Sequence, residues 1–334
     1  DPSGRTTERV LQTAEQVKHN ADSLTAQMKK LFGEDGSFTM MNNYDWLSKI
    51  SLLDFLRDYG KLFNINTMLA KDVVASRMET GISFTEFSYQ ILQSIDYKML
   101  YEKCGVQLQI GGADQWGNIT NGIELIRKTN ESHEAFGLTI PLMLKADGTK
   151  FGKTAGGAVW LDPKKTSPYE FYQFWFNQDD RDVVKYLKYF TFLTKEEIDT
   201  LDKEVQAHPE NRTAQKRLAE EVTRFVHGEA GLAQALKVTA ALFSGDIAEL
   251  TGEEIEGAFR NTKGGEVAFA PVNIVDALVE AGVEKSDITN GAVRVNGMQI
   301  KDTEASISAH PNTNGRFIII RKGKKNYFSI AIKE

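Results

Sequence analysis

The stretch "VQLQIGGADQWGNITNGIELI", Val106 to Ile126, predicts the fold of the first part of the chain. Apolar residues alternate from Val106 to Ile110, as in a half-buried strand, and the alternation ends at Gly111 and Gly112. Apolar residues then recur at spacings of three and four, which is typical of an amphipathic helix: Trp116, Ile119, Ile123 and Ile126. We expect a strand, a tight turn and a helix, with a ligand site at the turn, because ligands lie beyond the carboxyl ends of strands in open α/β sheets.

A second helix is predicted in "SFTEFSYQILQSIDYKML", Ser83 to Leu100, where Ser83 and Glu86 form a capping box. Three polar residues share one face of it because they stand at i, i+4 and i+7: Tyr89, Gln93 and Asp96. This stripe is either a solvent-facing edge or part of a site. Further polar groups at the strand end favour a site for a zwitterion that carries a hydroxyl: Gln109, Asp114 and Gln115.

The segment "LKADGTKFGKT", Leu144 to Thr154, places two lysines around a glycine. Three residues separate Gly148 from Gly152, whereas a P-loop has four and needs a helix to open at the lysine. The glycines and β-favouring residues that follow predict a loop. A mobile loop that holds a polyphosphate through two ammonium groups is therefore favoured over a P-loop.

The second half of the chain divides into two zones. Capping boxes at Ser167, Thr194 and Thr251 start helices in the first zone, and glycines at 228 and 245 end them. The last zone, from about residue 271, has one short helix, a hairpin that turns at Asn296 and Gly297, and a second hairpin with a basic turn. That basic turn suits either RNA binding or simple solvation of a hairpin.

Composition excludes several classes of protein. The net charge is −6, so no overall basic field indicates nucleic-acid binding. The single cysteine, Cys104, cannot form a disulfide within the chain and indicates a reducing compartment. No apolar run reaches the roughly 20 residues that cross a bilayer, and the five histidines have neither triad neighbours nor metal-site spacing. We expect a cytoplasmic protein without a membrane or DNA partner and without a protein-bound metal.

Five segments, in order along the chain, closely resemble the bacterial tyrosyl-tRNA synthetases: "DPSGRTTER", "NNYDW", "ETGISFTEFSYQILQ", "LQIGGADQWGN" and "ADGTKFGKT". The last is a variant of the Lys-Met-Ser-Lys-Ser signature of class I synthetases. The resemblance implies an α/β fold: a Rossmann-like parallel-sheet catalytic domain over 1–145, incomplete at its N-terminus, and a mobile loop and linker over 146–167. It also implies an α-helical anticodon-side domain over 168–262, a linker over 263–270, and a small α+β RNA-binding domain over 271–334.

The resemblance also assigns site residues. Asp1, Tyr89 and Gln93 match positions that hold the ammonium group of tyrosine, and Asp96 matches the acceptor for its phenolic hydroxyl. Gln109 and Gln115 match positions that line the amino-acid pocket. Asp114 matches the carboxylate that binds the ribose, and Gly112 matches a position where the backbone comes close to the adenylate. Five further residues match family positions whose cationic or hydroxyl side chains act on the pyrophosphate: Lys150, Lys153, Thr154, Arg5 and Arg9. Arg127 and Lys128 match a surface that receives tRNA.

The implied activity is that of a tyrosine–tRNA ligase, which uses ATP with Mg²⁺, makes tyrosyl-adenylate and transfers tyrosine to tRNA(Tyr). A homodimer is expected. The family's His-Ile-Gly-His type motif would precede Asp1, so we expect the complete site in a longer parent chain. A noncatalytic tRNA- or RNA-binding protein derived from a synthetase is the alternative.

Overall fold

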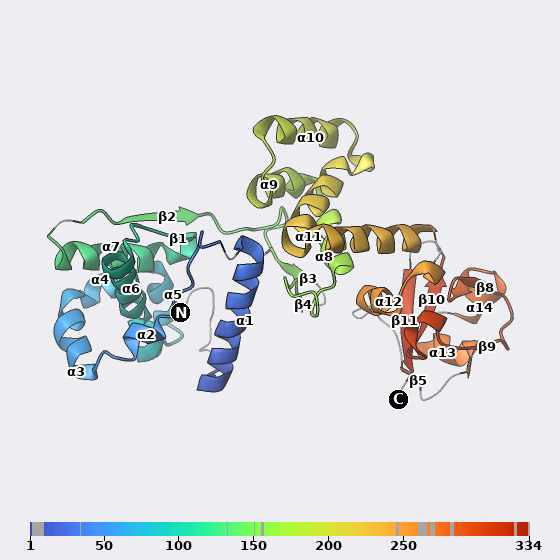
Figure 1. Cartoon of the computed structure of the whole chain (residues 1–334), viewed down its shortest axis with the longest axis horizontal. Coiled ribbons are helices and arrows are strands. Elements are labelled where there is room, and N and C mark those ends of the chain that lie inside the picture. The colour runs from blue at the N-terminus through green and yellow to red at the C-terminus, as the bar shows by residue number, and fades with distance from the viewer. Residues whose placement is uncertain are drawn as a thin grey trace. The chain divides into compact units, whose positions relative to one another are not determined.

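In the computed structural model, the described residues are 1, 10–33, 35–131, 133–149, 151–154, 157–244, 247–259, 266–267, 271–280, 284–323 and 326–332. They form two compact units, Asp1–Leu144 and Lys145–Glu334, which can be followed along the colour bar of Figure 1. Three predicted site residues lie outside the described residues: Arg5, Arg9 and Lys150. Among the described residues, no helix is long and apolar enough to cross a membrane.

The first unit is mainly helical, with one parallel pair of strands (Figure 1). Its helices are α1 (Ala14–Phe32), α2 (Tyr44–Leu47), α3 (Leu52–Asp54), α4 (Ile65–Leu69), α5 (Asp72–Met78), α6 (Phe84–Cys104) and α7 (Trp116–Thr129). A π-helical turn (Phe55–Tyr59) and 3₁₀ turns (Gly60–Leu62 and Ala113–Gln115) connect some of them. The core between α6 and its neighbours is apolar and includes Trp46, Met68, Ile91, Ile95 and Leu125.

Strands β1 (Leu108–Gly112) and β2 (Phe136–Ile140) pair in parallel, and α7 connects them. The predicted strand, turn and helix are confirmed, but the predicted end of the strand is wrong. β1 continues through Gly111 and Gly112, which pair with Thr139 and Ile140. The glycines are needed for close packing: a Cβ on Gly111 would lie 3.0 Å from the Cβ of Gln115.

Helix α6 begins at Phe84, as predicted, and the Ser83 hydroxyl accepts a hydrogen bond from the backbone N–H of Glu86. The Glu86 carboxylate also binds the Arg77 guanidinium of α5 at 2.8 and 3.2 Å, and Arg77 together with the Ser83 backbone lowers the pKa of this carboxyl. Both side chains are buried. A buried carboxylate needs a cation more than an exposed one does, and Arg77 supplies two N–H donors.

Two further polar contacts hold α6 in place. The Gln90 amide oxygen accepts a buried 3.0 Å hydrogen bond from Asn121 of α7. The Tyr97 hydroxyl lies 2.7 Å from the carbonyl of Gln107 and 2.8 Å from that of Phe136, so it ties α6 to both strands. Burial raises the pKa of Tyr97, which keeps this hydroxyl protonated. Gly122 of α7 makes room for the Tyr97 ring, since a Cβ there would lie 2.9 Å from it.

The helical part of the second unit follows a short hairpin of β3 (Lys153–Thr154) and β4 (Gly157–Ala158). Its helices are α8 (Pro168–Phe176), α9 (Asp180–Phe190), α10 (Lys195–Ala207), α11 (Thr213–Ser244) and α12 (Gly252–Phe259), with 3₁₀ turns at Pro209–Asn211 and Ile247–Glu249. The capping boxes at Ser167 and Thr194 are confirmed, and Thr251 exchanges the same two hydrogen bonds with Glu254. Gly228, with φ +73°, interrupts α11 where a helix end was predicted. The end predicted at residue 245 lies outside the described residues.

The last part of the second unit is a five-stranded sheet with the order β5-β11-β10-β7-β8. Its strands are β5 (Glu266–Val267), β7 (Val293–Val295), β8 (Met298–Ile300), β10 (Phe317–Lys322) and β11 (Asn326–Ile332), and β6 (Val272–Asn273) pairs separately with β9 (Ser306–Ile307). Both predicted hairpins are confirmed. Asn296 and Gly297 adopt φ +49° and +89°, as a tight hairpin turn requires.

Two short helices accompany this sheet, α13 (Ile274–Glu280) and α14 (Lys285–Thr289), and a 3₁₀ turn covers Pro311–Thr313. The prediction of one helix is therefore wrong. α14 has five residues and is too short to display an apolar periodicity. The sheet is joined to the helical part by the Tyr327 hydroxyl, which donates a 2.7 Å hydrogen bond to the carbonyl of Leu242 in α11.

Candidate active site

Asp96 is the best-defined group of the candidate site. Its Oδ1 accepts a 2.7 Å hydrogen bond from the indole N–H of Trp46, and its Oδ2 accepts a 3.0 Å hydrogen bond from the amide of Asn43. Trp46 is buried, whereas Asn43 is exposed. Both donors belong to the segment "NNYDW", and neither was predicted as a site residue. Asn43 and Trp46 place an amide donor and an indole donor three residues apart, and this spacing is the sequence signal that could have identified them as partners of a carboxylate.

The environment of Asp96 alters its acidity. Burial raises the pKa of this carboxyl above its ordinary value of 3.8, and the hydrogen bonds from Asn43 and Trp46 oppose that rise. A carboxylate offers about four lone-pair positions, of which the two protein donors use two. Asp96 can therefore accept a further hydrogen bond, and the two donors hold it in one orientation while it does so.

Two glutamines among the predicted site residues have amide oxygens without a hydrogen-bond partner in the described part of the chain. The amide oxygens of Gln93 on α6 and of Gln109 on β1 are buried, and neither has a hydrogen-bond partner among the described residues. A buried acceptor without a partner costs about 1–3 kcal/mol. A ligand that brings hydrogen-bond donors would remove this cost. Tyr89 lies on the same face of α6, as its spacing from Gln93 and Asp96 predicted.

Four of the predicted site residues lie close together at the carboxyl end of β1: Asp1, Gly112, Asp114 and Gln115. The Gln115 amide donates a 2.9 Å hydrogen bond to Asp1 and a 3.4 Å hydrogen bond to Asp114. Asn118 in turn donates to the Gln115 carbonyl at 3.2 Å. Gly112 leaves room for the Asp114 carboxylate, because a Cβ at this position would lie 2.5 Å from it. Residues 114 positions apart in the chain therefore meet at the turn where a ligand site was predicted.

A cavity of about 410 Å³ opens beside this turn. Its lining includes Asp114, Trp116 and Asn118 from the turn and α7, and Lys71 and Asp72 from the start of α5. The Lys71 ammonium group lies 3.4 Å from the Thr120 hydroxyl. Lys71 and Asp72 were not predicted as site residues, since nothing in their local sequence marks them.

The loop residues belong to the second unit. Lys153 and Thr154 form strand β3, in which they pair with Ala158 and Gly157. A P-loop would need a helix to begin there, so the P-loop alternative is wrong. Gly148 and Gly152 have φ values of +81° and +86°, a conformation that other residues rarely adopt.

The predicted tRNA contacts already have partners within the chain. Arg127 forms two hydrogen bonds with Glu124, at 2.6 and 2.7 Å, and Lys128 donates to the carbonyl of Leu62 at 2.7 Å. The Arg127 and Glu124 side chains are about half exposed, at 53% and 44%. An ion pair on the surface contributes at most about 1 kcal/mol to stability. Arg127 can therefore exchange Glu124 for a phosphate at a small cost in free energy.

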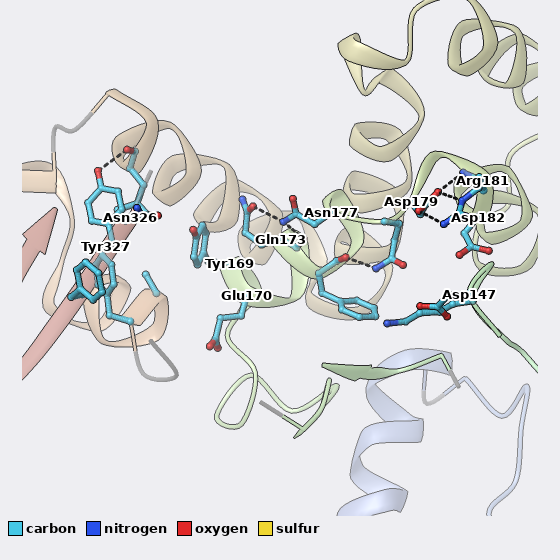
Figure 2. A pocket seen from close by; sticks show the side chains of 17 residues that line it. Asp147, Tyr169, Glu170, Gln173, Asn177, Asp179, Arg181, Asp182, Asn326 and Tyr327 are labelled. Atoms are coloured by element: carbon cyan, nitrogen blue, oxygen red, sulfur yellow. Dashed lines mark hydrogen bonds and ion pairs between the residues drawn. The ribbon is translucent and has the colours of Figure 1, made fainter. Parts of the chain in front are cut away.

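A cavity of about 900 Å³ in the second unit is lined by none of the predicted site residues. Figure 2 shows it between Asn326 and Tyr327 of the sheet, Tyr169 to Gln173 of α8 with its C-cap Asn177, and the start of α9. Its charged lining is mainly acidic, with Asp147, Glu170, Asp179 and Asp182 against Lys145 and Arg181. Within the described part of the chain, no group of three or more His, Cys, Asp or Glu side chains is placed to hold a metal ion.

Comparisons with known families match both halves of the chain. Residues 1–244 match the family "tRNA synthetases class I (W and Y)", and residues 254–330 match the "Tyrosine--tRNA ligase SYY-like C-terminal domain". A tyrosine–tRNA ligase of Latilactobacillus sakei is 64% identical over 340 residues, which cover 100% of this chain and 81% of the relative. Tyrosine–tRNA ligase 1 of Enterococcus faecalis is 65% identical over 342 residues, covering 100% of this chain and 82% of the relative.

Solved structures agree with these matches. A C-terminally truncated mitochondrial tyrosyl-tRNA synthetase of Aspergillus nidulans is 34% identical, with a TM-score of 0.61 and coverage of 73% of each chain. The corresponding Coccidioides posadasii protein is 31% identical, with a TM-score of 0.57 and coverage of 70% of each chain. The predicted α/β fold with a parallel-sheet catalytic domain is thereby confirmed. The chain belongs to the tyrosyl-tRNA synthetase family of class I tRNA synthetases.

Proposed function

We propose that this tyrosine–tRNA ligase recognises L-tyrosine on α6, with the Asp96 carboxylate accepting a hydrogen bond from the phenolic hydroxyl. The observation that carries this proposal is the geometry of Asp96, whose two oxygens are each held by one protein donor and each keep a lone pair. A bound phenylalanine would cover that carboxylate without supplying a donor. The cost of leaving a buried acceptor unpaired then discriminates against phenylalanine.

The ammonium group of tyrosine would be held by Asp1, Tyr89 and Gln93. An ammonium group has three donors and no acceptor, so it suits the buried, unsatisfied amide oxygen of Gln93. Gln109 would line the same pocket with a second such oxygen. Gln115 would contact the reacting carboxylate of tyrosine. Its amide N–H group already donates to two carboxylates, those of Asp1 and Asp114.

The activation step needs no nucleophile from the protein. The carboxylate of tyrosine attacks the α-phosphate of ATP, a new P–O bond forms, and the bond to the β-phosphate breaks to release pyrophosphate. The tyrosyl group then passes to the 3′ end of tRNA(Tyr). Negative charge that develops on the leaving phosphates would be stabilised by Lys150, Lys153, Thr154, Arg5 and Arg9. Interactions that strengthen in the transition state raise the rate itself.

ATP would enter as its Mg²⁺ complex, with the ion held by phosphate oxygens and water rather than by a dedicated protein cage. The ribose would bind Asp114. Gly112 would serve two purposes: it allows the backbone to approach the adenylate, and it leaves space for the Asp114 carboxylate. No tightly bound organic cofactor is needed for either step.

The tRNA would contact Arg127 and Lys128 on the first unit. We assign residues 168–262 to the anticodon side and 271–334 to a small RNA-binding domain, with 1–145 as the catalytic domain and 146–167 as the loop and linker between them. The ligase would act in the cytoplasm as a homodimer.

The test is tyrosine-dependent exchange of labelled pyrophosphate into ATP, measured with the full-length protein. Exchange that requires tyrosine, and that phenylalanine does not replace, is the expected result. Retention of tRNA binding without any exchange would instead support the noncatalytic RNA-binding alternative.

A further inference from the structure

One side chain of the loop is packed in the second unit among four aromatic rings. The ring centroid of Phe151 lies 4.6 Å from that of Tyr186, 5.4 Å from Trp175, and 5.6 Å from both Phe174 and Phe190. We call these four residues of α8 and α9 the aromatic socket. The socket rings also contact one another, as in the 4.9 Å pair of Trp175 and Phe190. Tyr186 and Trp175 are buried, at 0% and 5% exposure.

Helix α9 holds the loop at a second point. Asp182, Tyr186 and Phe190 stand at i, i+4 and i+8 and therefore share one face of the helix. The Asp182 carboxylate accepts a 2.8 Å hydrogen bond from the backbone N–H of Ala146, at the start of the loop. Asp182 and the loop residue Asp147 both border the cavity in Figure 2. One face of α9 thus contacts the loop through a polar group and through the socket.

The backbone around Phe151 has little conformational preference of its own. Gly148 and Gly152, on either side, have φ values of +81° and +86°, and a Cβ at either position would meet no atom within 4 Å. Glycine gains the most freedom when a segment loosens. Residues 145–149 form a closed turn, with the Lys145 N–H donating to the Thr149 carbonyl at 2.8 Å. The β3–β4 pairing holds the loop to itself, whereas the Phe151 ring holds it to α8 and α9.

We propose that Phe151 is a positioning residue, whose docking in the aromatic socket sets where the two loop lysines stand. In the sequence Lys150 precedes it directly and Lys153 follows two residues later, so Phe151 is the aromatic residue between the two lysines. This inference rests on the proposed function of the loop at the pyrophosphate. The roles of the lysines and of the aromatic ring can nevertheless be tested separately.

The first experiment requires no catalytic activity. Trypsin cleaves after lysine, so cleavage after Lys150 and Lys153 reports how often the loop leaves its docked position. Phe151→Ala should accelerate cleavage at these two sites by roughly tenfold, which corresponds to about 1.4 kcal/mol, the upper range for one aromatic pair. Phe151→Met should stay close to the unmodified protein, because methionine is large, apolar and packs well on aromatic rings.

Phe192→Ala is the matched control. Phe192 is 90% exposed and pairs with Phe225, outside the socket, so its removal should leave loop cleavage unchanged. Cleavage of Phe151→Ala at the unmodified rate would overturn the proposal. An acceleration spread evenly over the lysines of the second unit would also overturn it, because the ring would then support the whole fold.

The second experiment measures single-turnover adenylate formation in the full-length protein. Phe151→Ala should slow it by about 10- to 100-fold, the range expected when charged groups are misplaced by about 1 Å, with tyrosine affinity changed by less than about twofold. Phe151→Met should restore most of the rate. Lys153→Ala serves as the reference variant. If Lys153→Ala slows the reaction and Phe151→Ala does not, positioning by Phe151 is refuted. If neither variant slows it, the proposed role of the loop also fails.

Discussion

Replacing Asp96 by alanine tests the recognition of tyrosine most directly. In the folded protein Asp96 accepts hydrogen bonds from Trp46 at 2.7 Å and Asn43 at 3.0 Å, and we propose that tyrosine supplies a third. A hydrogen bond to a charged group is worth about 1.5–3 kcal/mol, so its loss lowers kcat/KM for tyrosine by about 10- to 150-fold. Phenylalanine loses no such bond. In the alanine variant, bound phenylalanine no longer covers a carboxylate that has unused lone pairs, so the kcat/KM for phenylalanine should rise.

The two effects act in the same direction on the selectivity ratio. Pyrophosphate exchange should be measured with tyrosine and with phenylalanine as the amino acid, and the ratio of the two kcat/KM values compared between variants. We expect the ratio to fall by at least about tenfold in Asp96→Ala. Glu102→Ala removes another acid from α6, one that forms an ion pair with Lys98, and should leave the ratio unchanged.

Asp96→Asn separates recognition from structure. Its amide oxygen can still accept from the buried Trp46 indole, whereas alanine leaves that donor unpaired at a cost of about 1–3 kcal/mol. The asparagine variant should therefore be more stable than the alanine variant and still less selective than the unmodified protein. An unchanged selectivity ratio in both variants, with exchange intact, would refute the role of Asp96.

Three other predictions concern acidity, the buried ion pair and the loop. Burial raises the pKa of Asp96, so the folded protein binds the proton on this carboxyl more tightly than the unfolded protein does. The contribution of Asp96 to the free energy of unfolding should therefore fall as pH rises from 3.8 through the raised pKa. The free energy of unfolding of Asp96→Asn, measured against pH, should lack that component. The pKa of Glu86 is lowered by Arg77, so its stabilisation should be present above pH 4.5 and lost as pH falls through the lowered pKa. Removing the cation with Arg77→Met should cost about 3–5 kcal/mol in urea unfolding; a cost below about 1 kcal/mol would mean that water already solvates Glu86. Lys153→Ala should lower the rate of adenylate formation with tyrosine affinity nearly intact, and an equal loss of both would assign the lysine to the fold instead.

Local sequence signals were sufficient for the elements that carry the site. The Ser83 cap and the spacing of polar residues predicted α6 and the stripe of Tyr89, Gln93 and Asp96, because both features depend on neighbours within about two helical turns. The Asn296–Gly297 hairpin was predictable for the same reason, since its turn requires positive φ values. The strand end at Gly111 was misjudged because glycine usually interrupts a strand, whereas here Gln115 and Ile119 lie so close that a Cβ would be crowded.

Partners that come from distant segments were not predictable. Asn43 and Trp46 lie 53 and 50 residues before Asp96, and no periodicity links them. Glu86 had a local role as a capping residue, but Arg77 offers a buried carboxylate a full charge and two N–H donors. The docking of Phe151 in the aromatic socket likewise depends on helices that begin 17 and 29 residues later. Tertiary contacts, rather than local preference, decide the surroundings of each of these side chains.

The position of these contacts on α6 has a physical consequence for selectivity. Glu86, Gln90 and Tyr97 form directional bonds to α5, α7 and the strands, and at 100° per residue they lie on a stripe beside that of the site residues. Apolar packing alone is non-directional, so it would allow α6 to rotate or slide at small cost. Discrimination by one hydroxyl requires an acceptor fixed to well within 1 Å. Buried polar contacts along α6 therefore provide an orientation that the apolar core cannot, even though burying the Arg77–Glu86 pair carries a desolvation cost.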